Sequence, residues 1–110
     1  MPKIFILNSN PIPPNPAELL DSKKMKNFIA EIKEYFDAIL FDAPPVLAVT
    51  DAQILSTLCD GVMLVAAYWQ AEKQGVARAK EAIDKVGGKI IGAVINKIPS
   101  NSKSYYYYNY

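Results

Sequence analysis

Four short runs of apolar residues alternate along the chain with segments of helical periodicity. The runs lie at residues 3–7, 38–42, 62–68 and 90–95. Nearly continuous apolar runs of this length are typical of strands that are buried on both faces of a parallel sheet. Strands that alternate with helices predict a parallel sheet with flanking helices and right-handed crossovers. The predicted fold class is therefore α/β.

Helix signals lie between these runs. Asn15 suits an N-cap ahead of Pro16, and Thr50 with Gln53 forms a capping-box pattern. Gly87-Gly88 is a typical helix terminator. Together with the spacing of the apolar residues, these signals predict one helix that begins at Pro16 and three further helices, over residues 23–36, 51 to about 58, and 71–86.

A carboxylate, Asp42, ends the second apolar run, and Pro44-Pro45 follows it. Proline has no amide hydrogen, so a strand ladder cannot continue through this pair. Asp42 is therefore predicted at the carboxyl end of a core strand, which is where ligands bind in open α/β sheets. A carboxylate in this Walker B arrangement can orient water on a nucleotide-bound magnesium ion. The alternative interpretation is a loop residue that caps a nearby group.

Asn96 directly follows the last apolar run. A carboxamide at a strand end can form hydrogen bonds with the N6 and N7 edge of adenine. Asparagine is also an ordinary turn residue, so the position alone leaves both interpretations open.

Composition limits the classes of function. The chain has 110 residues, of which 51% are hydrophobic and 21% charged, and its net charge is +1. This near-neutral balance gives no reason to expect a nucleic-acid partner. Histidine is absent and Cys59 is the single cysteine, which excludes a disulfide framework and a Cys/His zinc site. Cys59 is predicted to be a core residue rather than a nucleophile. Without a membrane-length apolar run or a signal-peptide pattern, a cytoplasmic location is expected.

Residues 100–110 have a different composition from the rest. They lack Val, Ile and Leu, so no strand or core segment is predicted there. We expect a domain over residues 1–99 and a tyrosine-rich tail over 100–110, whose clustered side chains suit phosphorylation, although stacking on a partner or aggregation is an alternative. The tail tyrosines are Tyr105, Tyr106, Tyr107, Tyr108 and Tyr110.

Three stretches of the sequence resemble the bacterial tyrosine kinases of capsular and exopolysaccharide biosynthesis. They are D-A-P-P-V-L-A-V-T-D-A-Q at 42–53, P-P-N-P-A-E-L-L at 13–20, and the terminal tyrosine cluster. That family usually has D-T-P-P-V, so Ala43 replaces a threonine hydroxyl. The resemblance covers nearly the whole chain but only the carboxyl-terminal half of the family's catalytic domain. It implies part of a P-loop NTPase-like fold.

The resemblance also implies roles and partners. ATP and magnesium would be the cofactors, Asp42 the catalytic and magnesium-side carboxylate, and Asn96 an adenine contact. The tail tyrosines would be autophosphorylated, and their phosphorylation would regulate polysaccharide synthesis. The implied partners are further copies of the chain or a complete kinase, and a membrane-bound activator that recruits the protein to the inner face of the membrane.

The sequence contains no P-loop, which needs a glycine-rich turn ahead of a helix, then Lys and Ser/Thr. Gly87-Gly88-Lys89 leads from a helix to a strand instead. In the family the P-loop strand lies between the Walker B strand and the next one, so these two strands should either close up or keep unpaired edges beside Asp42. We expect the chain alone to be inactive. The alternatives are a non-enzymatic regulatory or binding remnant that is phosphorylated in trans, or half of a partition-type ATPase.

Overall fold

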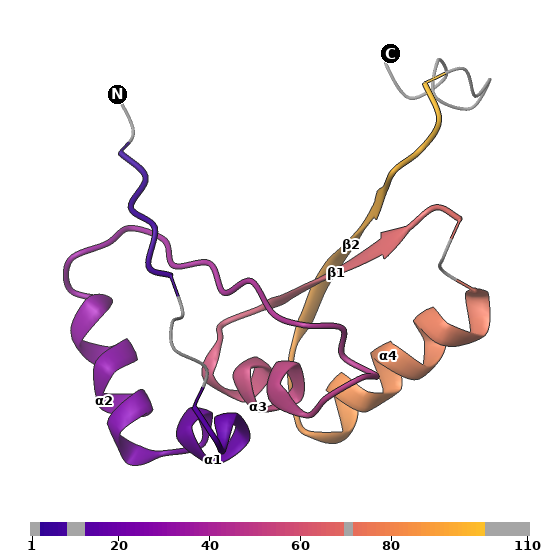
Figure 1. Cartoon of the computed structure of the whole chain (residues 1–110). Helices are drawn as coiled ribbons and strands as arrows, with labels where there is room; N and C mark the ends of the chain where they lie inside the picture. Colours follow the sequence, from indigo (N-terminus) through magenta and orange to yellow (C-terminus); the bar gives the residue numbers. More distant parts are fainter. Residues whose placement is uncertain (1–2, 9–12, 70–71, 101–110) are drawn as a thin grey trace.

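The computed structural model describes residues 3–8, 13–69 and 72–100, which form four helices and two strands (Figure 1). Within this part of the chain, no helix is long and apolar enough to cross a membrane. In chain order the elements are α1 (Pro16–Leu20), α2 (Lys23–Ile32), α3 (Asp51–Leu58), β1 (Val62–Ala67), α4 (Lys73–Lys85) and β2 (Ile90–Asn96).

The two strands form a parallel sheet, with α4 as the crossover between them. Their register runs from Val62 opposite Ile90 to Ala67 opposite Asn96, with one irregularity after Val62. The α/β class is thus confirmed, and both strands lie within one residue of their predicted bounds.

The strands predicted at 3–7 and 38–42 are wrong, because neither segment joins a ladder in the described structure. The rings of Phe5 and Phe36 pack edge to face with centroids 5.6 Å apart, which places the first segment beside the chain that leaves α2. Residues 38–42 do not pair with β1 either. An apolar composition suits a strand, but a strand exists only where a neighbour satisfies its backbone groups.

The second helix begins where predicted and ends early. The Ser22 hydroxyl accepts a hydrogen bond from the Met25 amide at 3.2 Å and caps the start of α2. At the other end, the amides of Glu34 and Tyr35 bond to carbonyls three residues back, at 3.2 and 3.0 Å. These tighter bonds replace the α-helical pattern after Ile32, so the predicted extension to residue 36 is wrong.

The third helix has the predicted bounds, but its capping box does not form. Thr50 is the N-cap residue and its side chain makes no capping bond. The side-chain Nε2 of Gln53 instead donates to the Val46 carbonyl at 3.3 Å. Gln53 therefore ties the loop that follows the two prolines to the first turn of α3.

The fourth helix spans Lys73–Lys85, slightly less than the predicted 71–86, and ends at the glycine pair. Gly87 has φ +81°, a conformation that costs glycine nothing. The amides of Gly87 and Gly88 donate to the carbonyls of Asp84 and Ile83 at 3.1 and 3.0 Å. These bonds satisfy carbonyls that the helix end leaves unpaired.

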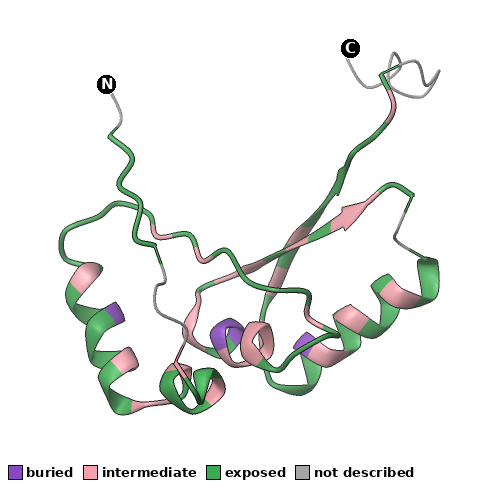
Figure 2. Ribbon diagram, in the orientation of Figure 1, coloured by how far each residue is buried: buried purple, intermediate pink, exposed green. Residues whose placement is uncertain are grey.

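The core of the described structure is small. Its buried apolar side chains are Ile29 on α2, Leu55 on α3 and Ile83 on α4, together with the buried hydroxyl of Ser56 (Figure 2). Helix α1 packs against α2 and α3, and α4 packs against α3 and β2. Each of the three longer helices thus buries only one apolar side chain, and neither strand of the sheet has a buried residue.

Candidate functional site

Asp42 lies in an extended, unpaired segment rather than at the end of a strand. Its side chain is exposed and forms no hydrogen bond or ion pair with the residues that the structure describes. A turn follows it, in which the Ala48 amide donates to the Pro45 carbonyl at 3.0 Å. The carboxylate is therefore open to an external ligand, but the predicted sheet position is wrong.

Asn96 is the last residue of β2, as predicted. Its backbone carbonyl accepts from the Tyr68 amide at 2.9 Å. Its side-chain Oδ1 accepts from the Lys97 amide at 2.8 Å, while Lys97 adopts φ +60°. The amide oxygen thus supports the turn, and the exposed Nδ2 group is left to donate to another partner. Both predicted interpretations of Asn96, turn residue and ligand contact, fit this geometry.

The predicted site residues Asp42 and Asn96 do not contact each other through a hydrogen bond in the described structure. The tail residues Tyr105, Tyr106, Tyr107, Tyr108 and Tyr110 lie outside the described part of the chain.

The described residues fit only part of a magnesium-nucleotide site. They contain no group of three or more His, Cys, Asp or Glu side chains placed to hold a metal. Magnesium keeps several waters and takes one or two protein carboxylates plus phosphate oxygens, so the single carboxylate of Asp42 is compatible with it. Phosphates need backbone amides at a glycine-rich turn before a helix, and Gly87-Gly88 follows a helix. Among the described residues, Gly87-Gly88 therefore does not provide a phosphate-binding turn of this kind.

Cys59 caps the carboxyl end of α3 and is half-buried. Burial raises the pKa of its thiol above the ordinary 9.0, the adjacent Asp60 carboxylate raises it further, and Lys33 acts in the opposite direction. A thiol held protonated is a poor nucleophile. Cys59 therefore lies at a helix end rather than in the core, and its chemistry does not suggest catalysis.

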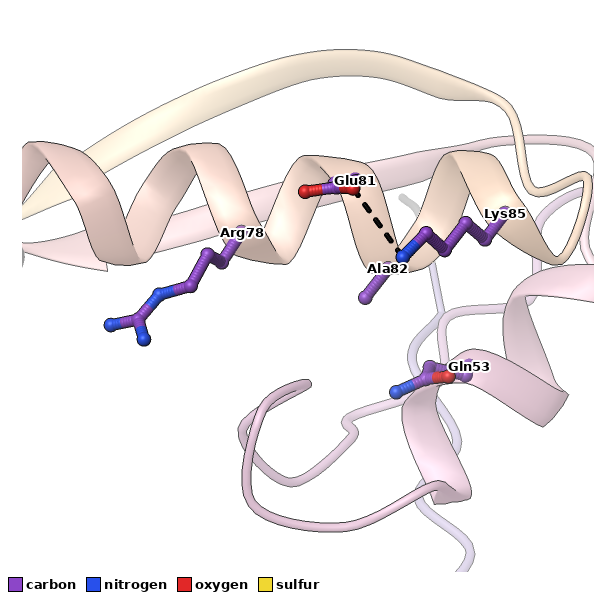
Figure 3. A pocket seen from close by; sticks show the side chains of 5 residues that line it. All are labelled: Gln53, Arg78, Glu81, Ala82 and Lys85. Carbon is purple, nitrogen blue, oxygen red and sulfur yellow. Dashed lines mark ion pairs between the residues drawn. The ribbon is translucent and has the colours of Figure 1, made fainter.

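A shallow hollow of about 370 Å³ lies between α3 and α4 (Figure 3). Gln53 lines it from α3, and Arg78, Glu81, Ala82 and Lys85 line it from α4. The Lys85 ammonium lies 3.3 Å from the Glu81 carboxylate, and both side chains are exposed. None of these α4 residues was predicted as a site residue, although their spacing in the sequence places them on one face of a helix. The hollow contains neither Asp42 nor Asn96.

Searches against known proteins identify relatives along nearly the whole chain. It is 48% identical over 104 residues to tyrosine-protein kinase YwqD of Bacillus subtilis, a match that covers 93% of this chain and 44% of the relative. It is 40% identical over 105 residues to the putative tyrosine-protein kinase CapB of Staphylococcus aureus, covering 96% of this chain and 46% of the relative. The chain thus spans a little under half the length of these relatives. No family model matches it.

A comparison with solved structures also identifies bacterial tyrosine kinases. The kinase domain of Escherichia coli tyrosine kinase ETK superposes with a TM-score of 0.78 at 28% identity, over 83% of this chain and 36% of that one. The chimerical protein CapA2B2 superposes with a TM-score of 0.77 at 37% identity, over 82% of this chain and 40% of that one. The arrangement of the described elements is therefore that of a part of these longer chains.

Proposed function

We propose, from the homology of this chain to part of the bacterial tyrosine kinases of capsule and exopolysaccharide synthesis, that it forms one side of the nucleotide site of such a kinase. The observation that carries this proposal is the 48% identity over 104 residues, which includes both candidate site regions. Bacterial tyrosine kinases transfer a phosphoryl group from ATP to tyrosine, so ATP is the expected cofactor.

Asp42 has the role of the magnesium-side carboxylate in this proposal. Its support is chemical: the side chain is exposed and unpaired in the described structure, and magnesium accepts a site with few protein carboxylates. Asn96 has the role of an adenine contact through its Nδ2 group, since Oδ1 already accepts from the Lys97 amide. Positioning and charge neutralisation dominate phosphoryl transfer, so both roles depend on a phosphate cradle supplied by other residues.

The tail tyrosines are the phosphoacceptors. Each phosphate adds about −1.5 to −2 charges near neutral pH. Five would change the charge of this +1 chain by roughly −8 to −10. Such a change would oppose docking on acidic or apolar surfaces, whereas unmodified tyrosines can stack and donate hydrogen bonds. Phosphorylation would thus switch the chain's association with itself, a complete kinase or a membrane-bound activator.

A chimera tests the catalytic roles. Residues 1–110 of this chain would replace the matching segment of the Bacillus subtilis kinase, and autophosphorylation would be followed by phosphotyrosine mass spectrometry. We expect activity that Asp42→Asn abolishes and an increased KM for ATP in Asn96→Ala. Asp37→Asn is the matched control, because Asp37 is an exposed carboxylate on the same connecting segment. A folded chimera that stays inactive, or full activity in Asp42→Asn, contradicts the proposal.

A second candidate function follows from the missing cradle: a regulatory chain that a complete kinase phosphorylates in trans. Here Asp42 would be dispensable and only the tail would matter. Incubation of the chain with the complete Bacillus subtilis kinase and magnesium-ATP should then place phosphate on the tail in both wild type and Asp42→Asn. Phosphate found only on Tyr35 or Tyr68, or on no tyrosine, would exclude the tail as the acceptor in either candidate function.

A further inference from the structure

A groove of about 670 Å³ opens between α4 and the sheet. Helix α4 lies alongside the two strands that it connects and packs against β2 (Figure 1). The walls of the groove are mostly apolar, with Leu64 on β1, Val76 and Ala77 on α4, and residues 90–93 on β2. Ile91 remains 63% exposed, so apolar surface of the sheet is uncovered here. These residues all belong to elements that are consecutive along the chain, so one β–α–β unit forms the groove.

Two lysines, Lys73 and Lys80, complete the lining. Lys73 is the first residue of α4 and Lys80 lies about two turns further along the helix. No acidic residue is among the described lining residues. Lys73 forms no ion pair within the described part of the chain, and Lys80 lies 2.6 Å from Asp84 in a solvent-exposed pair, which is weak. The groove thus combines apolar walls with two cations that an anionic ligand can reach.

The tyrosine tail has the chemistry and the length to occupy this groove. A phosphotyrosine joins an aromatic ring, which suits apolar walls, to a phosphate of about −1.5 to −2 charges, which suits lysines. Because β1 and β2 are parallel and α4 connects them, the start of α4 and the end of β2 lie at the same edge of the sheet. Ser100 is seven residues beyond Ala93, a distance of at most about 25 Å, and residues 101–110 can span about 33–36 Å. The tail is therefore long enough to fold back over the groove.

We propose that the groove between α4 and the sheet binds the phosphorylated tyrosine tail of the same chain, with the rings against the apolar walls and the phosphates on Lys73 and Lys80. This inference rests on the proposed function in one respect, the role of the tail tyrosines as phosphoacceptors. Phosphorylation opposes docking on acidic or apolar surfaces, and the two lysines distinguish this groove from both. The unmodified tail carries Lys103 and no acidic side chain, so the same lysines do not attract it. Phosphorylation would then withdraw the tail from other partners.

Synthetic peptides test this binding without any kinase reaction. Peptides of residues 101–110, either phosphorylated on all five tyrosines or unmodified, are added to the full chain, and binding is measured by calorimetry. We expect the phosphopeptide to bind at least about tenfold more tightly than the unmodified peptide. A peptide with glutamate at the five tyrosine positions has negative charge but no ring, and should bind more weakly than the phosphopeptide. Backbone amide chemical shifts should change at residues 73–80 and 90–93, a test that needs no variant.

Two glutamine variants separate the groove from the general charge of α4. Lys80→Gln removes one cation and its i,i+4 ion pair with Asp84, and Lys85→Gln does the same with Glu81 outside the groove. We expect Lys80→Gln to weaken phosphopeptide binding about threefold, and roughly tenfold when combined with Lys73→Gln. Lys85→Gln, the matched control, should leave it within about 1.5-fold. Circular dichroism checks that the helices stay folded in each variant.

The full chain itself tests docking in cis. Phosphotyrosine incorporated genetically at Tyr107 and Tyr108 should change the shifts of residues 73–80 in the same way, at every protein concentration, and the chain should sediment as a monomer. A dimer that forms on phosphorylation would show that the tail binds a second copy, and would overturn the proposal. Equal binding of the phosphorylated and unmodified peptides, or equal effects of Lys80→Gln and Lys85→Gln, would also overturn it.

The outcome is independent of the nucleotide site, because the phosphate is introduced by synthesis or during translation and no ATP is present. Docking alongside an inactive chimera would overturn the proposed function alone. An active chimera whose phosphorylated tail does not dock would overturn this inference alone.

Discussion

The adjacent glycines after α4, Gly87 and Gly88, allow the same substitution to alanine to be compared at two neighbouring positions. The two substitutions should lower the free energy of unfolding for different physical reasons. A Cβ on Gly88 would lie 2.7 Å from Cγ2 of Ile83 and 2.8 Å from Oγ of Ser56, two of the buried side chains. A Cβ on Gly87 would meet nothing within 4 Å, but the residue has φ +81°. Gly88→Ala is therefore a packing change in the core, whereas Gly87→Ala is a backbone change at the surface.

The magnitudes follow from these contacts. Overpacking a core costs about 1–3 kcal/mol. Because Ile83 and Ser56 are only 1% and 4% exposed, we place Gly88→Ala in the upper part of this range, at about 2–3 kcal/mol. The left-handed conformation costs an alanine about 1–2 kcal/mol. Replacing glycine by alanine also lowers the conformational entropy of the unfolded chain, which stabilises the folded state by about 0.4–1 kcal/mol. Gly87→Ala should therefore lower the free energy of unfolding by about 1 kcal/mol. Gly88→Ala is thus expected to be the more destabilising of the two.

Urea unfolding followed by far-ultraviolet circular dichroism measures both free energies of unfolding. Ser56→Ala removes the Oγ atom that Gly88→Ala would meet, so Gly88→Ala should cost less in that background than in wild type. A larger cost at Gly87 than at Gly88, or strict additivity of Gly88→Ala with Ser56→Ala, would refute this account of the contact between α4, α3 and the start of β2.

Four shorter predictions use the same unfolding assay or the reactivity of the thiol. Ile83→Ala should lower the free energy of unfolding by about 2–5 kcal/mol, because Ile83 is only 1% exposed; a change below about 1 kcal/mol would contradict its role in the core. Asp42→Asn should change it by less than about 0.5 kcal/mol, since the carboxylate is exposed and unpaired in the described structure; a larger loss would reveal a structural role. Iodoacetamide should modify Cys59 more slowly in the folded chain than in urea, because the folded state raises the thiol's pKa above 9.0. The stability that accompanies this raised pKa is present below pH 9.0 and is lost as the pH rises above it, which urea titrations on either side of pH 9.0 can detect.

The candidate site was predictable only where one local element defines it. Asn96 ends β2 as the sequence indicates, because a short apolar run and the turn after it are read from neighbouring residues. Asp42 follows an apolar run in the sequence, but a place at a strand end depends on partner strands elsewhere, and the described structure has none beside it. Gln53 was assigned to a capping box, and its actual acceptor, the Val46 carbonyl, could be known only from the path of the loop.

The sequence by itself determined the starts of α1 and α2, the bounds of α3, the glycine stop after α4 and the kinase homology. Helix ends depend mostly on residues a few positions apart, so their positions are largely readable from the local sequence, although the capping bond predicted for Thr50 does not form. The tertiary structure decided which apolar runs became strands. Residues 62–67 and 90–96 pair with each other across the α4 crossover, while 3–7 and 38–42, equally apolar, have no described neighbour to bond with. A strand takes half of its hydrogen bonds from each side, and those partners come from distant parts of the chain or from another chain.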